Sequence, residues 1–312
     1  MMFKTGISWR KALPALAMAL GLVAQSAFPY PAAPKGKITV GGKLDVEAQL
    51  LTEMYTQLLT NSGYAVTEKL ALGNSIIVHK AITSGAIDLY PEFTATGLNT
   101  LGLKSAYDPQ KDYQAVKSGY ESKFRITWLD MAPLNDGYGI CTSKAISQKL
   151  GIASISQLAQ QAGQIVLASP SDGIDFLDGL KTAYGIDTTS FKNLQKVDYS
   201  IGFASVAGNS AQMCVGYTTD GSVATQDFIF LQDDKNGFPQ FHPAPIVRMD
   251  LLKKYPDVAA VLNRLAPKLT TDVSIQLQDQ VGKLKSSGTS VTEAVKQVAK
   301  QFLQGAGLIP SM

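Results

Sequence analysis

The chain has 312 residues, of which 45% are hydrophobic and 17% are charged, and its formal net charge is +3. This composition is typical of a globular protein and excludes a largely disordered chain. The length is sufficient for one large domain or for two domains of medium size.

The N-terminal segment has the three parts of a secretory signal peptide. Basic residues precede an apolar run over residues 12–24, which ends among small residues. The run is too short to span a bilayer comfortably, and no cysteine near it marks a lipid attachment site. We therefore expect a cleaved signal peptide at 1–27, a proline-rich lead at 28–36 and a diffusible periplasmic protein. An uncleaved membrane anchor is the alternative.

Cleavage would change the charge of the protein, because the segment carries basic residues and no acidic ones. The formal charge of the mature chain is then about zero. A neutral chain lacks the basic surface that attracts nucleic acid or an anionic membrane, so we expect neither as a partner.

The sequence contains two cysteines, Cys141 and Cys214. In an exported protein they could form a disulfide. Because both lie in apolar, strand-like runs, two buried free thiols are an equal alternative. A single pair is too small for a zinc cluster, so we expect no metal site.

The hydrophobic pattern alternates between strand and helix. In the first part of the chain, Asp45 opens a helix whose apolar residues recur at spacings of three and four. The predicted order there is strand 37–42, helix 45–61, strand 64–70, helix 74–85 and strand 86–90. After residue 125, strands are predicted at 126–130, 137–143, 164–169, 210–221 and 228–234, with helices at 154–163 and 172–185. From residue 249 the pattern is helical, with helices at 250–255, 257–269 and 272–288 and a last one opened by the capping box 290–293.

This alternation predicts an α/β fold in which mostly parallel sheets are flanked by helices. Two such units of about a hundred residues each, followed by a helical segment, fit a two-lobed exported protein with a ligand cleft between the lobes. In open α/β sheets, ligands bind at the carboxyl ends of the strands. The stretch YPEFTATG at 90–97 follows the third predicted strand, and we expect it to face the cleft.

The sequence lacks the common catalytic motifs. It has no G-x-S-x-G elbow, no H-E-x-x-H, no phosphate-binding loop and no G-x-G-x-x-G. The two histidines, His79 and His242, are far apart in the sequence, and His79 lies among apolar residues of a predicted helix. Asp88 and Glu92 could form a carboxylate pair, but such a pair more often binds nearby backbone donors or a lysine. We therefore predict a protein that is not an enzyme and that uses no cofactor.

Four aromatic residues stand next to polar loops at strand ends: Phe93, Tyr138, Tyr217 and Phe241. Each one alone would be interpreted as a core residue. Together they favour a shared aromatic-walled cavity. Such a cavity attracts a cation whose charge is spread over methyl groups that cannot form hydrogen bonds.

Several segments resemble the substrate-binding proteins of osmoprotectant ABC importers, which bind glycine betaine, choline, carnitine or proline betaine. The segments are YPEFTATG, PLNDGYGI, GYTTDGSVATQDFIFLQDDKNGFPQFHPAPIVR and DLLKKYPDV. GGKLDVEAQLL and AITSGAIDLYPEFT are most similar to the OsmF-type branch. The resemblance extends from about Lys37 to the C-terminus. It implies a type II periplasmic binding protein with one lobe of residues 37–133 plus 245–312 and a second of 134–244.

In these relatives an aromatic box, usually made of tyrosines, holds the quaternary ammonium group. The resemblance places this box at Phe93, Tyr138, Tyr217 and Phe241. Two of the four rings therefore lack the hydroxyl group that the relatives carry.

The resemblance also implies polar contacts to the ligand. Lys43 and Thr96 match two donors that hold the ligand's carboxylate in relatives. A third donor, an arginine of the second lobe, has no counterpart, and three aspartates stand in its neighbourhood: Asp172, Asp175 and Asp178. This difference favours a ligand with a hydroxyl group or without an anion, such as choline, or a bulkier cationic ligand. Asn74 is a further candidate contact, or alternatively the N-cap of the helix that follows.

The expected function is capture of a quaternary ammonium osmoprotectant by a monomeric periplasmic protein and its delivery to the permease of an ABC importer. Two alternatives stay open. The same fold could bind another small cationic or zwitterionic metabolite, or the chain could be an exported enzyme that uses Asp or Glu for acid–base chemistry.

Overall fold

The structure is a computed structural model that describes residues 1–2, 33–170, 174, 177–220 and 227–311. Apart from Met1 and Met2, the predicted signal peptide lies outside these residues. The chain from Pro34 onward forms one compact unit, to which all the elements below belong. Within the described residues, no helix combines the length and the apolar character that crossing a membrane requires.

The first sheet consists of β1 (Lys37–Gly41), β2 (Ala65–Lys69), β3 (Leu89–Phe93), β4 (Ile126–Trp128) and β10 (Pro243–Arg248). Their order across the sheet is β2-β1-β3-β10-β4. β1 is parallel to β2 and β3, whereas β10 is antiparallel to both of its neighbours. β10 therefore runs against the direction of the other strands.

The second sheet consists of β5 (Tyr138–Ser143), β6 (Val166–Ser169), β7 (Asn193–Lys196), β8 (Met213–Tyr217) and β9 (Phe228–Phe230). Their order is β7-β6-β8-β5-β9. β6 is parallel to β7 and β8, whereas β5 is antiparallel to β8 and β9. Each sheet thus has one reversed strand, and the predicted α/β class is confirmed.

The chain passes from the first sheet to the second between β4 and β5, and it returns between β9 and β10. The two crossing segments, 129–137 and 231–242, contact each other, because the backbone N–H of Asp136 donates to the carbonyl of Phe241 (3.0 Å). The lobe boundaries at 133/134 and 244/245 stay a prediction.

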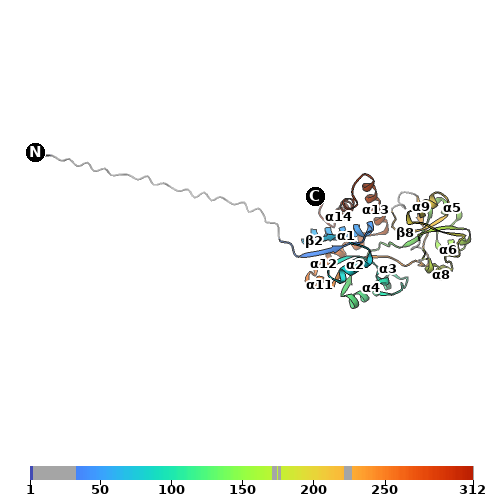
Figure 1. The fold of residues 1–312 in the computed structure, drawn as a ribbon, viewed down its shortest axis with the longest axis horizontal. Helices are drawn as coiled ribbons and strands as arrows, with labels where there is room; N and C mark the ends of the chain where they lie inside the picture. The colour runs from blue at the N-terminus through green and yellow to red at the C-terminus, as the bar shows by residue number, and fades with distance from the viewer. Residues whose placement is uncertain (3–32, 171–173, 175–176, 221–226, 312) are drawn as a thin grey trace. The chain divides into compact units, whose positions relative to one another are not determined.

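Helices pack on the two faces of the first sheet (Figure 1). One face carries α1 (Val46–Asn61), α12 (Asp257–Asn263), α13 (Thr271–Ser286) and α14 (Val291–Gly305), and the other carries α2 (Ser75–Thr83), α3 (Thr94–Leu101) and α4 (Pro109–Phe124). α11 (Met249–Lys254) follows β10, and the short 3-10 helix η2 (Ala266–Lys268) follows α12. Side chains alternate along β3, so Leu89 and Phe93 join the core beside α1, whereas Tyr90 joins the opposite core.

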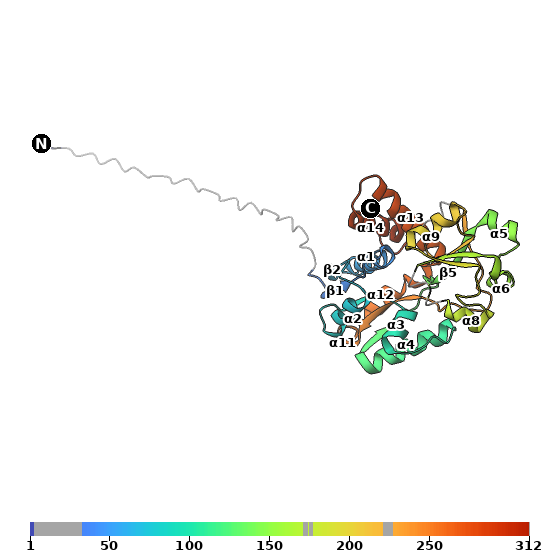
Figure 2. The same cartoon turned by 45° about the vertical axis from the view of Figure 1, so that its right-hand side comes forward.

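The second sheet has its own helices, α5 (Lys144–Leu150), α6 (Ile155–Ala159), η1 (Ala162–Gln164), α8 (Asp178–Tyr184) and α9 (Tyr199–Ala207) (Figure 2). Along β8, Met213 and Val215 belong to the core beside α6 and α8. Cys214 points the other way, into a smaller core with Phe203 of α9.

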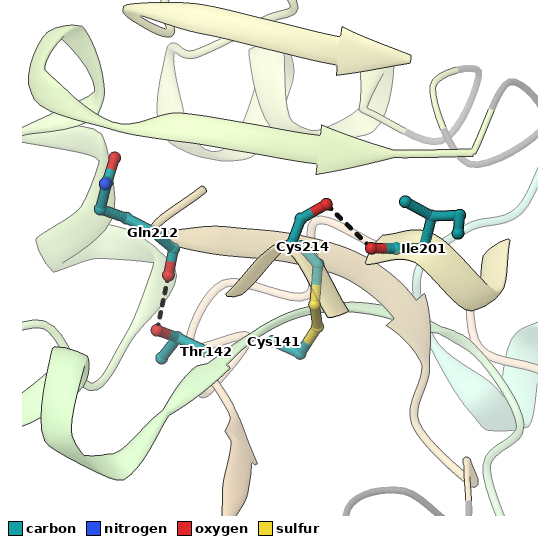
Figure 3. Close-up of a disulfide and its surroundings, with 6 residues drawn as sticks. Cys141, Thr142, Ile201, Gln212 and Cys214 are labelled. Carbon is teal, nitrogen blue, oxygen red and sulfur yellow. Dashed lines mark hydrogen bonds between the residues drawn. A yellow bond between two sulfur atoms is a disulfide. The ribbon is translucent and has the colours of Figure 1, made fainter. Parts of the chain in front are cut away.

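Cys141 and Cys214 stand opposite each other on β5 and β8 and form a disulfide (Figure 3). Their Cα atoms are 5.0 Å apart, which is within the range that a disulfide bridges. Beside the bridge, the Thr142 hydroxyl donates to the carbonyl of Gln212 (2.8 Å). Of the two alternatives for the cysteines, the structure has the disulfide.

Several elements were not expected from the sequence: α3, α4, α5, α9, β7 and β10. The segment of β10 contains Pro243 and Pro245, which argue against a central strand because proline cannot donate a ladder hydrogen bond. α4 did carry a signal, because Asp108 caps it by accepting from the N–H groups of Gln110 and Lys111, and Pro109 occupies its first position.

Candidate functional site

A cavity of about 350 Å³ is lined by residues from the strand ends of both sheets. Lys43 follows β1, Phe93 ends β3 and Tyr217 ends β8. Thr96 lies in the first turn of α3, and Phe241 lies in the second crossing segment. Of the seven residues predicted to contact a ligand, these five line the cavity.

Phe93 and Phe241 are held in place by the polar contacts of their neighbours. The Thr94 hydroxyl donates to the carbonyl of Gln240 (2.9 Å) and accepts from the N–H of His242 (3.1 Å). The N–H of Phe241 donates to the side-chain oxygen of Asn135 (2.7 Å). These hydrogen bonds anchor the backbone beside both residues to the crossing segments.

Tyr138 and Tyr217 form a pair across β5 and β8. Their ring centroids are 4.6 Å apart at an interplanar angle of 32°, and the Tyr138 hydroxyl donates to that of Tyr217 (2.8 Å). Tyr217 lines the cavity, whereas Tyr138 contacts it through Tyr217. A direct contact between Tyr138 and a ligand stays a prediction.

Lys43 forms a buried ion pair with Glu92. Glu92 also accepts from the hydroxyl of Tyr90 (2.8 Å) and from the N–H of Phe93 (2.8 Å), so this carboxylate binds a lysine and a backbone donor as expected. The Lys43 ammonium lies 5.0 Å from the centroid of the Phe93 ring. The positive charge of Lys43 is therefore already paired with Glu92 in the ligand-free protein.

Asn74 caps α2, because its side-chain oxygen accepts from the N–H of Ile77 (3.1 Å). It is exposed and is not among the residues that line the cavity. Its neighbour Ser75 lines the cavity instead. The structure thus gives Asn74 the capping role that was its alternative interpretation.

The sequence did not reveal the other polar residues of the cavity, which are Asp45, Glu47, Ser75, Asp136, Thr219, Asp220 and Gln278. Asp45 was recognised as a helix cap, and it does accept from the N–H of Ala48 (2.7 Å). Oε2 of Glu47 accepts from the hydroxyl of Ser274 (2.6 Å) and from the Gln278 amide (3.1 Å). Both partners lie on α13, far along the chain, so no local pattern could have indicated them.

The carboxylates raise one another's pKa. Burial, followed by the charge of Asp136, raises the pKa of Glu47 well above its ordinary value. Burial raises the pKa of Asp136 to about 7; a hydrogen bond from Thr219 opposes this rise, and the charges of Asp45 and Asp220 add to it. This wall of the cavity therefore favours a positively charged occupant.

The sequence places three aspartates near the position of the relatives' arginine. Asp172 and Asp175 lie outside the described residues, as does the side chain of Asp178.

A sequence profile of one protein family matches residues 36–305 of the chain. The family is described as the substrate-binding domain of the ABC-type glycine betaine transport system.

Three curated proteins are similar along most of the chain. The ergothioneine transport permease/ergothioneine binding protein EgtU of Helicobacter pylori is 28% identical over 295 residues, which cover 94% of this chain and 51% of that protein. The chain therefore spans about half the length of this relative. The carnitine transport binding protein OpuCC of Listeria monocytogenes is 27% identical over 86% of this chain and 87% of its own. The glycine betaine-binding protein YehZ of Escherichia coli is 29% identical, with 83% and 90% covered.

Solved structures show the same fold. A crystal structure of a glycine betaine/carnitine/choline ABC transporter aligns with a TM-score of 0.76 and 22% identity over 87% of this chain and 99% of that one. The ligand-free structure of YehZ from Escherichia coli aligns with a TM-score of 0.73 and 28% identity, covering 89% and 100%.

Proposed function

We propose that this chain, which belongs to the family of substrate-binding domains of ABC-type glycine betaine transport systems, captures a small quaternary ammonium compound in its cavity and delivers it to the permease of an ABC importer. The observation that carries the proposal is the meeting of Phe93, Tyr217 and Phe241 at one cavity, from positions far apart in the sequence.

The chemistry of these rings suits such a ligand. A quaternary ammonium group spreads its charge over methyl groups that cannot donate hydrogen bonds, so the faces of aromatic rings are its natural partners. Each well-placed ring contributes about 0.5 to 2 kcal/mol. Three such rings together contribute about 1.5 to 6 kcal/mol, and burial of the ligand's apolar surface and its polar contacts supply the rest of the roughly 8 kcal/mol that micromolar affinity requires. The cavity volume of about 350 Å³ is in the lower part of the range for small-molecule sites.

Its relatives point to the same chemical class. They are named for ergothioneine, carnitine and glycine betaine, each of which carries a trimethylammonium group. We infer a ligand of this class, with Thr96 and Lys43 as further contacts and with Tyr138 positioning Tyr217.

We further propose that the protein is exported through its N-terminal signal, acts outside the cytoplasm as a monomer and releases its ligand unchanged. The disulfide between Cys141 and Cys214 supports an oxidising compartment.

A second candidate is a bulkier or more strongly cationic metabolite in the same site. The carboxylates that line the cavity favour a ligand with more positive charge. A second cavity of about 630 Å³ shares Thr96 and Phe241 with the first, which provides room for a larger ligand.

The test is a calorimetric titration of the purified mature protein with choline, glycine betaine, carnitine and ergothioneine. We expect saturable binding of at least one of them at micromolar concentration, and mass spectrometry should recover that ligand unmodified. Absence of binding by all four would contradict the proposed class, and conversion of the ligand would reveal an enzyme.

A further inference from the structure

We propose that Glu47 determines which second group the ligand carries: the site selects a quaternary ammonium compound whose second group donates a hydrogen bond, such as a hydroxyl, over one whose second group is a carboxylate. This inference rests on the proposed function, because it assumes that the rings hold an ammonium group in the same cavity.

The charge of the cavity is the first support. Four carboxylates line it: Asp45, Glu47, Asp136 and Asp220. Among the described residues of its lining, Lys43 is the cation, and it is paired with the buried Glu92. A ligand carboxylate would add a further anion to this lining, whereas a ligand without one brings net positive charge to it.

The contacts of Glu47 are the second support. Its side chain lines the cavity and is only 4% exposed. Ser274 and Gln278 both donate to Oε2, and Thr219 also interacts with the carboxyl group, whereas Oε1 has no donor within hydrogen-bond distance in the described part of the chain. A buried acceptor without a donor is costly, so this atom favours a ligand that brings an O–H or N–H group. When Glu47 is ionised, a ligand carboxylate, which accepts only, cannot satisfy this atom.

The position of Glu47 fixes this acceptor. It stands in the first turn of α1, behind the N-cap Asp45, where exposed backbone N–H groups stabilise a negative charge. Its two donors belong to α13, a separate helix. Glu47 is therefore held from two elements and does not have to move to meet a ligand.

The protonation of Glu47 gives an independent test of its role. Burial and the charge of Asp136 raise the pKa of Glu47, so a bound cation should favour the ionised carboxylate and release a proton. Four charged groups line the cavity with Glu47: Asp45 at the end of its own helix, Asp136 in the first crossing segment, Asp220 after β8 and Lys43 after β1. The residues of α13 that contact Glu47, Ser274 and Gln278, are neutral. Affinity for a cationic ligand should therefore increase as the pH rises and Glu47 loses its proton.

The experiment compares four probes by calorimetric titration: choline, its O-methyl ether, glycine betaine and tetramethylammonium. The O-methyl ether keeps the charge of choline and removes the donor. We expect choline to bind at least about tenfold more tightly than the ether or glycine betaine. Equal affinity for choline and its ether, or tighter binding of glycine betaine, would overturn the inference.

Two matched variants locate the effect. Glu47→Gln removes the charge at the cavity, and Glu53→Gln makes the same change on the same helix, at a side chain that is also 4% exposed but does not line the cavity. Glu47→Gln should reduce the preference for choline over glycine betaine by about tenfold and flatten the pH dependence. Glu53→Gln should leave both unchanged. A uniform loss for all probes in Glu47→Gln would show a merely structural role and overturn the inference.

Failure of this inference is distinguishable from failure of the proposed function. If tetramethylammonium and choline bind but the second group makes no difference, the aromatic site stands and the role of Glu47 is wrong. If none of the four probes binds, both are wrong.

Discussion

Replacing Tyr217 by leucine perturbs the ring on which the proposed site most depends. Its ring lies 4.6 Å from that of Tyr138, and the two hydroxyl groups are hydrogen-bonded. Loss of a cation–π contact costs about 0.5 to 2 kcal/mol of binding free energy. The ring pair with Tyr138 is present without ligand, so its loss of about 0.5 to 1.5 kcal/mol lowers stability and is not added to the binding term. The binding loss of about 0.5 to 2 kcal/mol corresponds to an affinity loss of roughly 2- to 30-fold.

Stability should respond as well. Tyr217 is only partly buried, and we expect the free energy of unfolding to fall by about 1 to 3 kcal/mol, because the ring pair and the hydrogen bond between the Tyr138 and Tyr217 hydroxyls are lost. The matched control is Phe203→Leu. That ring packs against Phe228 in the core beside the disulfide and does not line the cavity. It should lose about 1 kcal/mol of stability and retain the wild-type affinity.

The assay combines urea unfolding with calorimetric titration of choline and tetramethylammonium. Tyr217→Phe, which keeps the ring, should bind within about threefold of wild type. Wild-type affinity in Tyr217→Leu, together with weakened binding in Phe203→Leu, would refute the reasoning.

Three further predictions concern the cap, the disulfide and the acidic wall. Asn74→Ala removes the acceptor for the N–H of Ile77, so the free energy of unfolding in urea should fall by about 0.5 to 2 kcal/mol while ligand affinity stays unchanged. Weaker ligand binding at unchanged stability would reveal that Asn74 contacts the ligand. Reducing the Cys141–Cys214 bridge, whose ends are 73 residues apart, should lower the free energy of unfolding by about 4 kcal/mol, and an unchanged urea midpoint in reductant would count against this. Burial raises the pKa of Asp136 to about 7, from about 3.9 in the unfolded chain, so its contribution to stability is complete below about pH 4 and is lost as the pH rises through 7. The melting temperature of the ligand-free protein should therefore fall over this range, and it should fall less in Asp136→Asn; equal slopes would contradict the assignment.

The aromatic part of the site could be predicted because its signals are local. Tyr217 ends an apolar run that is followed by polar residues, and Phe93 stands where the apolar residues Ile87 and Leu89 give way to a polar stretch; both patterns mark the end of a strand. Carboxyl ends of strands gather at one edge of an α/β sheet, so residues distant in sequence were expected to meet.

The acidic part could not be predicted in the same way. A carboxylate in the first turn of a helix, such as Glu47, is ordinarily explained by the helix dipole. What distinguishes it is its contact with Ser274 and Gln278, which lie 227 and 231 residues further along the chain. Such a contact follows from the tertiary packing of α1 and α13 and from no pattern within either helix.

Two elements, β10 and α4, were not expected from the sequence, for different reasons. β10 was missed because Pro243 and Pro245 oppose a central strand, yet it pairs with β3 and β4. α4 was missed although Asp108 and Pro109 form a readable start. β10 is defined by its neighbours in the sheet, whereas α4 begins at a local sequence signal.

The most direct test of the proposed function is a crystal structure of the mature protein grown with choline. We predict a trimethylammonium group enclosed by Phe93, Tyr217 and Phe241, with the hydroxyl group directed to Glu47. Choline bound elsewhere would contradict the assignment of this cavity as a quaternary ammonium site, and an empty cavity at saturating choline would contradict the inferred preference for a hydroxyl group.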